Sequence, residues 1–346
     1  MGPWVGLRFA PDYTVRPLKA PVSLPTLGLL AGASLWGVVW YPYRLLAEAG
    51  IDGIWSTLLT YGFALVAGVI AFPRHAAILG RIPPLALLMG LAIGWSNLAY
   101  VLAVLEGEIV RVLLLFYLAP LWTVPIARLV LGERLDRSGF TVMALAFTGA
   151  MAMLWRPELG FPWPSARAEW LGLVAGFLFA LGNVLVRRLD TLTDAAKSIV
   201  IWAGVVVAAL VHLPGSSVGA QQAWALAVDH RALIGAVGLA LLVMSLALQY
   251  GLSRLPANRA IVILLFELVV AAIAAAWLAG ETPRTQDWIG GALIVAATLA
   301  SAWKGKGSDP PKKWCQRRFL RQAEKSSLTP FFYLPRCSAR NFSIAS

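Results

Sequence analysis

One carboxyl group, that of Glu267, lies at the centre of a strongly apolar stretch, residues 257–278. It is the eleventh of the twenty-two residues in this stretch, which is long enough to span the hydrocarbon core of a bilayer. A charge at the bilayer midplane costs about 2.5–3.5 kcal/mol on insertion scales, so an acid there either faces a wet cavity or keeps its proton. The position therefore predicts a contact for a substrate amine or a proton-coupling carboxyl. The alternative is a protonated glutamate that hydrogen-bonds between helices.

Polar and aromatic side chains inside other apolar stretches form the rest of a predicted cavity. Asn97 and Tyr100 are three residues apart, and Ser245 and Gln249 are four apart, so each pair lies on one face of its helix. The candidate substrate or coupling residues beside Glu267 are Trp36, Trp40, Asn97, Tyr100, Tyr117, Asn183, Ser245 and Gln249. The alternative for each one is hydrogen bonding between helices, with the tryptophans filling the core.

Two prolines, Pro120 and Pro125, interrupt the apolar stretch 109–131. Each lacks a backbone donor and clashes with the carbonyl four residues earlier, so each predicts a helix kink. A carbonyl freed at membrane depth persists only beside protein or water. The kink is therefore predicted to line a cavity and to present Tyr117 or Thr123, unless it is only a packing bend.

The composition predicts the protein class that must position these residues. Of 346 residues, 59% are hydrophobic and only 13% are charged, about half the charge of a soluble protein. This excludes a soluble enzyme and a disordered chain, and leaves an all-α integral membrane protein. About 20 apolar residues cross a bilayer. By that measure the sequence predicts ten transmembrane helices, at about 26–46, 54–72, 84–105, 109–131, 139–155, 168–186, 197–213, 232–252, 257–278 and 287–303.

The distribution of Lys and Arg predicts the orientation of these helices. With the N-terminus inside, 23 of the 29 basic residues fall on the inner side and six on the outer side. Positive charge collects on the cytoplasmic side of membrane proteins, so both termini are predicted in the cytoplasm of a multi-pass protein of the cell (cytoplasmic, or inner) membrane. Residues 304–346 hold ten of these basic residues and are predicted to be a disordered tail that meets anionic lipids and not nucleic acid.

The chain contains an internal repeat. LGLLAG begins at residue 27 and LGLVAG at residue 171, and Gly132-Glu133 reappears as Gly280-Glu281. Both Gly-Glu pairs are predicted to be structural: the glycine as a helix stop, and the glutamate for capping or for a hydrogen bond toward the next helix. Five helices per unit is an odd number, so the second unit must be inverted relative to the first. The predicted organisation is an N-terminal segment 1–25, a first five-helix repeat 26–155, a second repeat 156–303 and the tail 304–346.

Three segments resemble the EamA-type transporters of the drug/metabolite transporter superfamily. They are ASLWGVVW (33–40), LFYLAPLWTVPIARLVLGERL (115–135) and LLFELVVAAIAAAWLAGE (264–281). The resemblance covers about residues 26–303 and implies ten helices in two repeats and the transport of a small organic metabolite. The family often has Glu-Pro in the ninth helix, where this chain has Glu267-Leu268, so a kink there is not expected from the sequence.

Signals for enzymatic chemistry are absent from the sequence. It contains no HExxH, GxSxG or phosphate-binding loop, and its two cysteines, Cys315 and Cys337, lie in the tail. We therefore expect no enzyme, no cofactor and no metal. The predicted function is secondary transport, as an exporter working by alternating access, with proton coupling through Glu267. The alternatives are a membrane scaffold or sensor with a recruiting tail, and an intramembrane lipid-modifying enzyme. The oligomeric state stays open, with a homodimer among the options.

Overall fold

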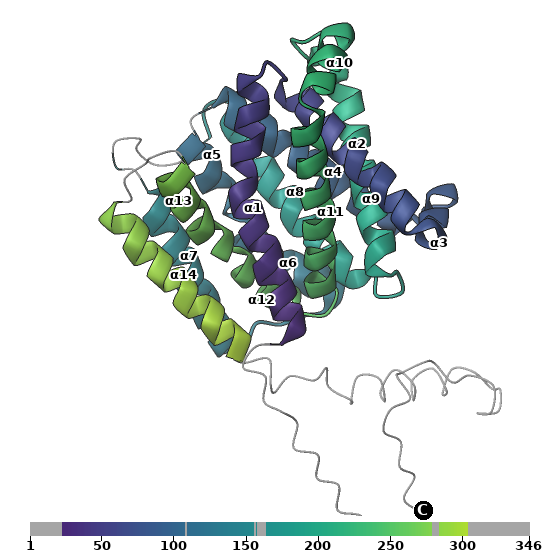
Figure 1. Cartoon of the computed structure of the whole chain (residues 1–346). Coiled ribbons are helices and arrows are strands. Elements are labelled where there is room, and N and C mark those ends of the chain that lie inside the picture. Colours follow the sequence, from purple (N-terminus) through teal and green to yellow (C-terminus); the bar gives the residue numbers. More distant parts are fainter. Residues whose placement is uncertain (1–22, 108, 156, 158–163, 279–283, 304–346) are drawn as a thin grey trace, which may run out of the picture. The chain divides into compact units, whose positions relative to one another are not determined.

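The computed structural model describes residues 23–107, 109–155, 157, 164–278 and 284–303, and this part of the chain is helical throughout (Figure 1). The chain divides into two compact units, Met1–Trp303 and Lys304–Ser346, and the described residues all belong to the first. Within the predicted first repeat lie α1 (Leu24–Glu48), α2 (Gly53–Ala71), α3 (Pro73–Ala76), η1 (Ala77–Gly80), α4 (Pro84–Glu106), α5 (Ile109–Phe116), α6 (Ala119–Leu131) and α7 (Arg137–Leu154). Within the predicted second repeat lie α8 (Arg167–Arg188), α9 (Asp194–His212), η3 (Leu213–Gly215), α10 (Ala220–Asp229), α11 (Arg231–Leu252), α12 (Ala257–Leu264), α13 (Phe266–Leu278) and α14 (Thr285–Trp303).

The predicted class, an all-α protein with many membrane spans, is confirmed. Nine segments of the described chain are long and apolar enough to cross a membrane, with α5–α6 and α12–α13 each forming one of them. The tenth predicted span corresponds to α14, which begins with the polar residues Thr285, Gln286 and Asp287 and is not among these nine. It lies along α7.

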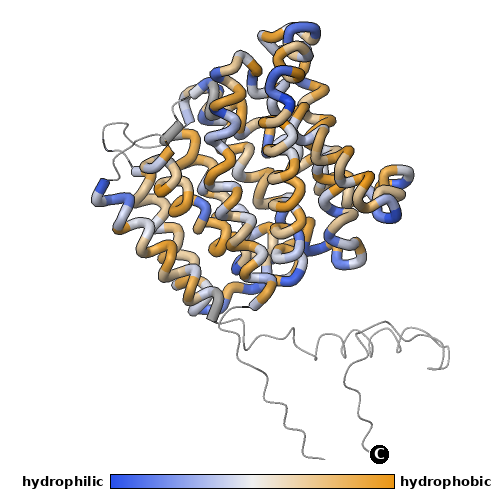
Figure 2. Tube along the Cα trace, in the orientation of Figure 1, coloured by the Kyte–Doolittle hydropathy of each residue, from blue (hydrophilic) through white to orange (hydrophobic). Residues whose placement is uncertain are grey.

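The described helices are hydrophobic along most of their length, with hydrophilic residues gathered mainly near their ends (Figure 2), and many large apolar side chains are exposed. Leu129 and Trp277 are each 85% exposed, and Ile70, Phe140 and Trp288 are also largely exposed. In water such a surface would be an association site. In a bilayer these side chains face acyl chains or the headgroup boundary.

The two repeats interlock. Helix α4 of the first repeat packs on α8 and α9 of the second, and its counterpart α11 packs on α1 and α2 of the first. In the same way α6 packs on α8, and α13 packs on α1. Figure 1 shows α1 and α11 side by side, although they are far apart in the sequence. Each repeat is therefore buried mainly against the other.

Glycines allow this close packing between repeats. A Cβ atom on Gly204 of α9 would lie 2.1 Å from the carbonyl oxygen of Gly90 on α4, and one on Gly94 would lie 2.4 Å from that of Gly204. A Cβ on Gly176 of α8 would likewise lie 2.4 Å from the carbonyl oxygen of Phe116. Small residues let membrane helices approach at backbone distance, where van der Waals contact replaces the missing hydrophobic force.

Both repeats break their fourth span. In the first repeat α5 ends at Phe116 and α6 starts at Ala119, with Pro120 in its first turn. Pro125 lies within α6, which continues past it. The second repeat breaks at Leu265, between α12 and α13, although it has no proline there. An interruption that was not expected from the sequence is therefore present, two residues before Glu267.

Candidate functional site

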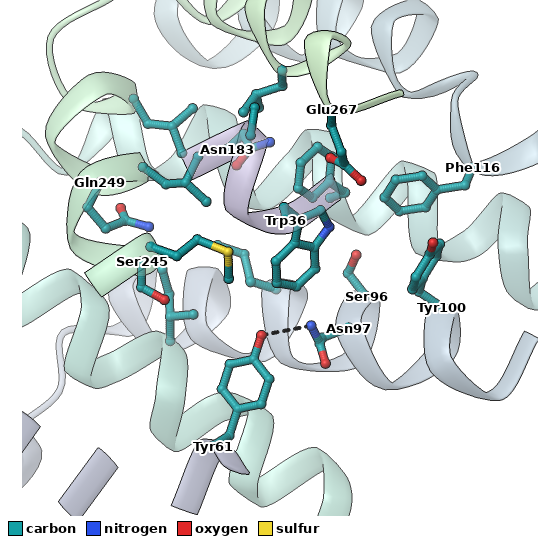
Figure 3. A pocket seen from close by; sticks show the side chains of 18 residues that line it. Trp36, Tyr61, Ser96, Asn97, Tyr100, Phe116, Asn183, Ser245, Gln249 and Glu267 are labelled. Atoms are coloured by element: carbon teal, nitrogen blue, oxygen red, sulfur yellow. Dashed lines mark hydrogen bonds between the residues drawn. The ribbon is translucent and has the colours of Figure 1, made fainter. Parts of the chain in front are cut away.

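A cavity of about 80 Å³ lies among the helices of both repeats (Figure 3). Seven of the residues predicted from the sequence line it: Trp36, Asn97, Tyr100, Asn183, Ser245, Gln249 and Glu267. Tyr117 and Pro120 instead border a smaller neighbouring cavity, of about 10 Å³, which Glu267 also lines. Trp40 and Pro125 line neither cavity, and the Trp40 ring packs edge-on against Tyr41 at 5.7 Å between centroids.

The cavity is built by the same four spans of each repeat. The first repeat contributes α1, α2, α4 and the end of α5, and the second contributes α8, α9, α11 and the α12–α13 span. The fifth helices, α7 and α14, give no residue to the lining among the described residues. This is the arrangement in which a site between inverted repeats is expected.

Among the described lining residues, Glu267 is the one that belongs to the Asp, Glu, Lys and Arg group. It is the second residue of α13, is 8% exposed and accepts a hydrogen bond through Oε1 from Tyr117 Oη at 2.9 Å. The bond crosses from the second repeat to the break in the first. The helix break thus brings a carboxyl and a phenol together at the wall of the cavity.

Several polar atoms of the wall have partners within the protein. Asn97 Nδ2 donates to Tyr61 Oη at 2.9 Å, and Trp202 Nε1 donates to Ser245 Oγ at 3.0 Å. Ser96 Oγ donates to the carbonyl oxygen of Ala175 at 2.8 Å, tying α4 to α8. The contact of Ser245 fits the alternative of hydrogen bonding between helices, and Ser96, which the sequence did not single out, bonds between helices in the same way.

Three other amide atoms of the wall have no partner among the residues that the structure describes. They are Asn97 Oδ1, Asn183 Nδ2 and Gln249 Oε1, and all three are buried. A buried polar atom without a hydrogen bond costs about 1–3 kcal/mol, and native proteins contain few of them. Three around one cavity indicate a site that offers hydrogen bonds to a bound molecule or to water.

Aromatic rings form one side of the cavity. Phe116 packs against Tyr100, Tyr117 and Phe179 at centroid distances of 5.0, 5.3 and 5.4 Å. In Figure 3 the indole of Trp36 lies between this side and the side formed by Ser245 and Gln249. Sequence analysis did not single out Phe116 and Phe179, because a phenylalanine in a cavity wall and one facing lipid look alike in an apolar span.

One end of the bundle is joined by contacts of Asp52, the N-cap residue of α2. Its Oδ1 accepts from Trp55 N at 2.9 Å, and its Oδ2 accepts from Ser216 Oγ at 2.5 Å and Ser217 N at 3.2 Å. Trp55 Nε1 also donates to the carbonyl oxygen of Val218 at 2.9 Å. The start of α2 is therefore tied to the loop after η3, across the two repeats.

The other end is joined by a polar cluster around Glu133, which follows Gly132, a left-handed residue (φ 71°) that ends α6. Glu133 Oε2 accepts from Ala257 N at 2.9 Å, and Oε1 lies 3.9 Å from Arg187 Nε. Burial raises the pKa of the Glu133 carboxyl, against the opposing effect of Arg187 and of the N–H groups of Ala257 and Asn258. The carboxylate thus caps the start of α12, and capping was one of the two roles expected for it from the sequence.

No group of three His, Cys, Asp or Glu residues that could hold a metal ion occurs in the described part of the chain. The cavity instead combines a carboxyl, amides and aromatic rings within a membrane-spanning bundle. These are groups that bind an organic molecule.

Residues 167–303, which lie within the predicted second repeat, match the model of the EamA-like transporter family. The match covers 137 of the 346 residues. The resemblance inferred from the sequence is thereby confirmed for this part of the chain.

Two relatives extend the comparison. Protein RarD of Streptomyces exfoliatus is 28% identical over 174 residues, which cover 47% of this chain and 52% of RarD. The chain thus matches about half the length of that relative. An uncharacterized transporter of Archaeoglobus fulgidus is 28% identical over 261 residues, which cover 74% of this chain and 89% of that protein. The second match is too long to lie within the second repeat alone.

The fold itself recurs in a solved crystal structure. That structure superposes with a TM-score of 0.63 over 82% of this chain and 99% of the other, at 18% identity. The identity is low, so the match supports the arrangement of the helices alone.

Proposed function

We propose that the protein is a secondary transporter that moves a small organic molecule across a cell membrane by alternating access. The observation that carries this proposal is the cavity built from equivalent spans of the two repeats, with Glu267 and three unpartnered amide atoms in its described wall. A site placed between inverted repeats is reached from either side when one repeat rocks against the other.

The size of the cavity supports a cycle with an opening step. Sites for drug-sized ligands measure about 300–1,000 Å³, and this cavity of about 80 Å³ is smaller. Loading therefore needs the helices to separate, and the Asp52 contacts and the Glu133 cluster are the links that would break at opposite ends.

We also propose a direction of transport and a coupling residue. Lys and Arg placement favours cytoplasmic termini, and we propose export from the cytoplasm. Glu267 sits beside the break in its helix, where a small backbone motion can bring the carboxyl to either side. We propose that it carries the coupling proton, with Tyr117 positioning it.

Metabolite profiling tests the transport function. Cells that overexpress the protein and cells that lack it are compared for metabolites inside and in the medium, and the strongest hit is measured as flux in proteoliposomes. We expect a compound enriched in the medium of overexpressing cells. Identical profiles for both strains, together with no flux for any candidate, would contradict the proposal.

Glu267→Gln tests the coupling role. We expect loss of flux driven by a pH gradient, with normal expression and an unchanged elution profile. Glu48→Gln is the matched control, because Glu48 pairs with Arg44 on the surface, at 3.0 Å, away from the cavity. If the Glu267→Gln variant carried flux with unchanged pH dependence, the coupling role would be wrong.

The basic segment 304–346 supports a second candidate function, a scaffold or sensor that recruits partners. Deletion of residues 304–346 separates the two functions. A transporter keeps its flux without the segment, whereas a recruiting protein loses its activity.

A further inference from the structure

The carboxyl of Glu267 lacks a cationic partner within the described residues. Its Oε1 accepts from Tyr117, and its Oε2 has no hydrogen-bond partner in the described part of the chain. The side chain is more than nine-tenths buried and faces the cavity (Figure 3). A buried carboxylate is stable when a positive charge pairs with it, and no Lys or Arg is among the described lining residues.

The aromatic rings beside this carboxyl suit a cation as well. Trp36, Tyr100 and Phe116 line the cavity together with Glu267. The faces of aromatic rings attract ammonium groups, tryptophan most strongly, and the attraction grows as the cation loses its water. The same rings bind the flat apolar part of a ligand by dispersion and area burial.

The unpartnered amide atoms determine which hydrogen-bonding groups of a ligand the cavity wall can bind. Asn97 Oδ1 and Gln249 Oε1 are acceptors, and they lie on α4 and α11, which occupy equivalent places in the two repeats. Asn183 Nδ2 is a donor. The wall therefore offers acceptors to N–H groups at two points and a donor to an oxygen or ring nitrogen.

We propose that the cavity recognises a small organic ammonium ion with a flat apolar body. Its N–H groups bind the Glu267 carboxylate, its body packs between Trp36 and Phe116, and Asn97 and Gln249 accept its remaining donors. This inference rests on the proposed transport function and names its substrate class. Anions are disfavoured, because they would meet an unpaired carboxylate and no cation in the described lining.

Three probes that share one ring test the charge preference. Benzylammonium, benzyl alcohol and benzoate, each radiolabelled, are offered at pH 7 to the full-length purified protein in lipid nanodiscs, and equilibrium binding is measured. We expect benzylammonium to bind about tenfold or more tightly than the alcohol, because a hydrogen bond to a charged group is stronger than one between neutral groups. Benzoate is expected not to bind.

Two sets of variants assign the binding to this cavity. Glu267→Gln should weaken benzylammonium binding about tenfold or more and abolish its preference over benzyl alcohol, whereas Glu48→Gln should change neither. Trp36→Leu should weaken benzylammonium binding about threefold, and Trp36→Phe should restore most of it. The Trp36 pair serves as an independent test if the Glu267→Gln variant does not fold.

Other outcomes overturn the substrate class. They are equal binding of benzylammonium and benzyl alcohol, tighter binding of benzoate, and no binding of any probe by a folded wild-type protein. None of these outcomes contradicts the transport function, which metabolite profiling and flux measurements test separately. Conversely, specific benzylammonium binding without flux of any compound would leave an ammonium site in a protein that is not a transporter.

Discussion

Lys197 Nζ donates to Ser253 Oγ at 2.8 Å and to the carbonyl oxygen of Val186 at 2.9 Å, and the lysine is only 1% exposed. Ser253 in turn receives Arg187 Nη1 at its carbonyl oxygen, at 2.6 Å. One buried ammonium thereby joins the start of α9 to the ends of α8 and α11, on the side of the bundle where Glu133 caps α12.

Lys197→Met is expected to destabilise the protein. The substitution leaves the carbonyl oxygen of Val186 and the hydroxyl of Ser253 without their donor, at a cost of about 1–3 kcal/mol. We expect a melting temperature several degrees lower in detergent. Arg188→Met is the control, because Arg188 is exposed and only one residue from Arg187. Equal melting temperatures for the Lys197 variant and wild type would show that the buried ammonium is dispensable.

The pKa of Glu133 predicts a pH dependence of stability. Because burial raises this pKa in the folded state, the folded protein holds the proton to a higher pH than the unfolded chain, whose value is near 4.5. Stability from this group is thus complete below the unfolded pKa and is lost as the pH rises through the folded pKa.

Glu133→Gln keeps an acceptor for Ala257 N but cannot ionise. The melting temperature of wild type, relative to this variant, is therefore expected to fall as the pH rises from the unfolded pKa through the raised folded pKa. The opposite trend would mean that the Arg187 pair outweighs desolvation. Glu133→Ala, which removes the acceptor, should be less stable than the Gln variant at every pH.

Gly204→Ala tests the close contact of the repeats. The added Cβ would lie 2.1 Å from the carbonyl oxygen of Gly90. Relief of this clash would need a shift of helix backbone, not the rotation of a flexible side chain. Overpacking of this kind costs about 1–3 kcal/mol. Gly62→Ala on α2 is the control, since a Cβ there meets no atom within 4 Å and alanine favours the helix. A Gly204 variant as stable as the Gly62 variant would contradict the packing.

A disulfide across the Asp52 contacts should stop transport. Asp52→Cys with Ser216→Cys is made in a background that has Cys315→Ser and Cys337→Ser, which removes the two native cysteines. Oxidation is expected to abolish flux and a reductant to restore it, while Asp52→Cys alone responds to neither. Full flux in protein shown by mass spectrometry to be bridged would mean that this end does not open.

Local sequence patterns predicted the spans and much of the cavity for physical reasons. A bilayer requires about 20 apolar residues per crossing, so the predicted stretch 257–278 coincides with the span Ala257–Leu278. Asn97 and Gln249 stood out because a polar residue in such a span needs a partner or a cavity. Both line the cavity, and each keeps an atom without a partner among the described residues.

Other features depend on tertiary structure and could not be predicted. The helix break at Leu265 occurs without a proline, so the sequence does not indicate it. Trp36 and Trp40 are four residues apart on one helix face, but Trp36 lines the cavity and Trp40 does not. The same limit applies to Phe179, whose place in the wall follows from how α8 packs against α5.

The two predicted repeats differ in chemistry at the position of Glu267. At the offset that aligns Gly132 with Gly280, the position equivalent to Glu267 is Ala119, so the acid exists in one repeat alone. In the proposed cycle each repeat takes the conformation that the other had. Because only one repeat carries the acid, the inward-open and outward-open states are not equivalent by symmetry. The two end states of the proposed cycle therefore differ in chemistry, and nothing in the repeat symmetry makes their energies equal.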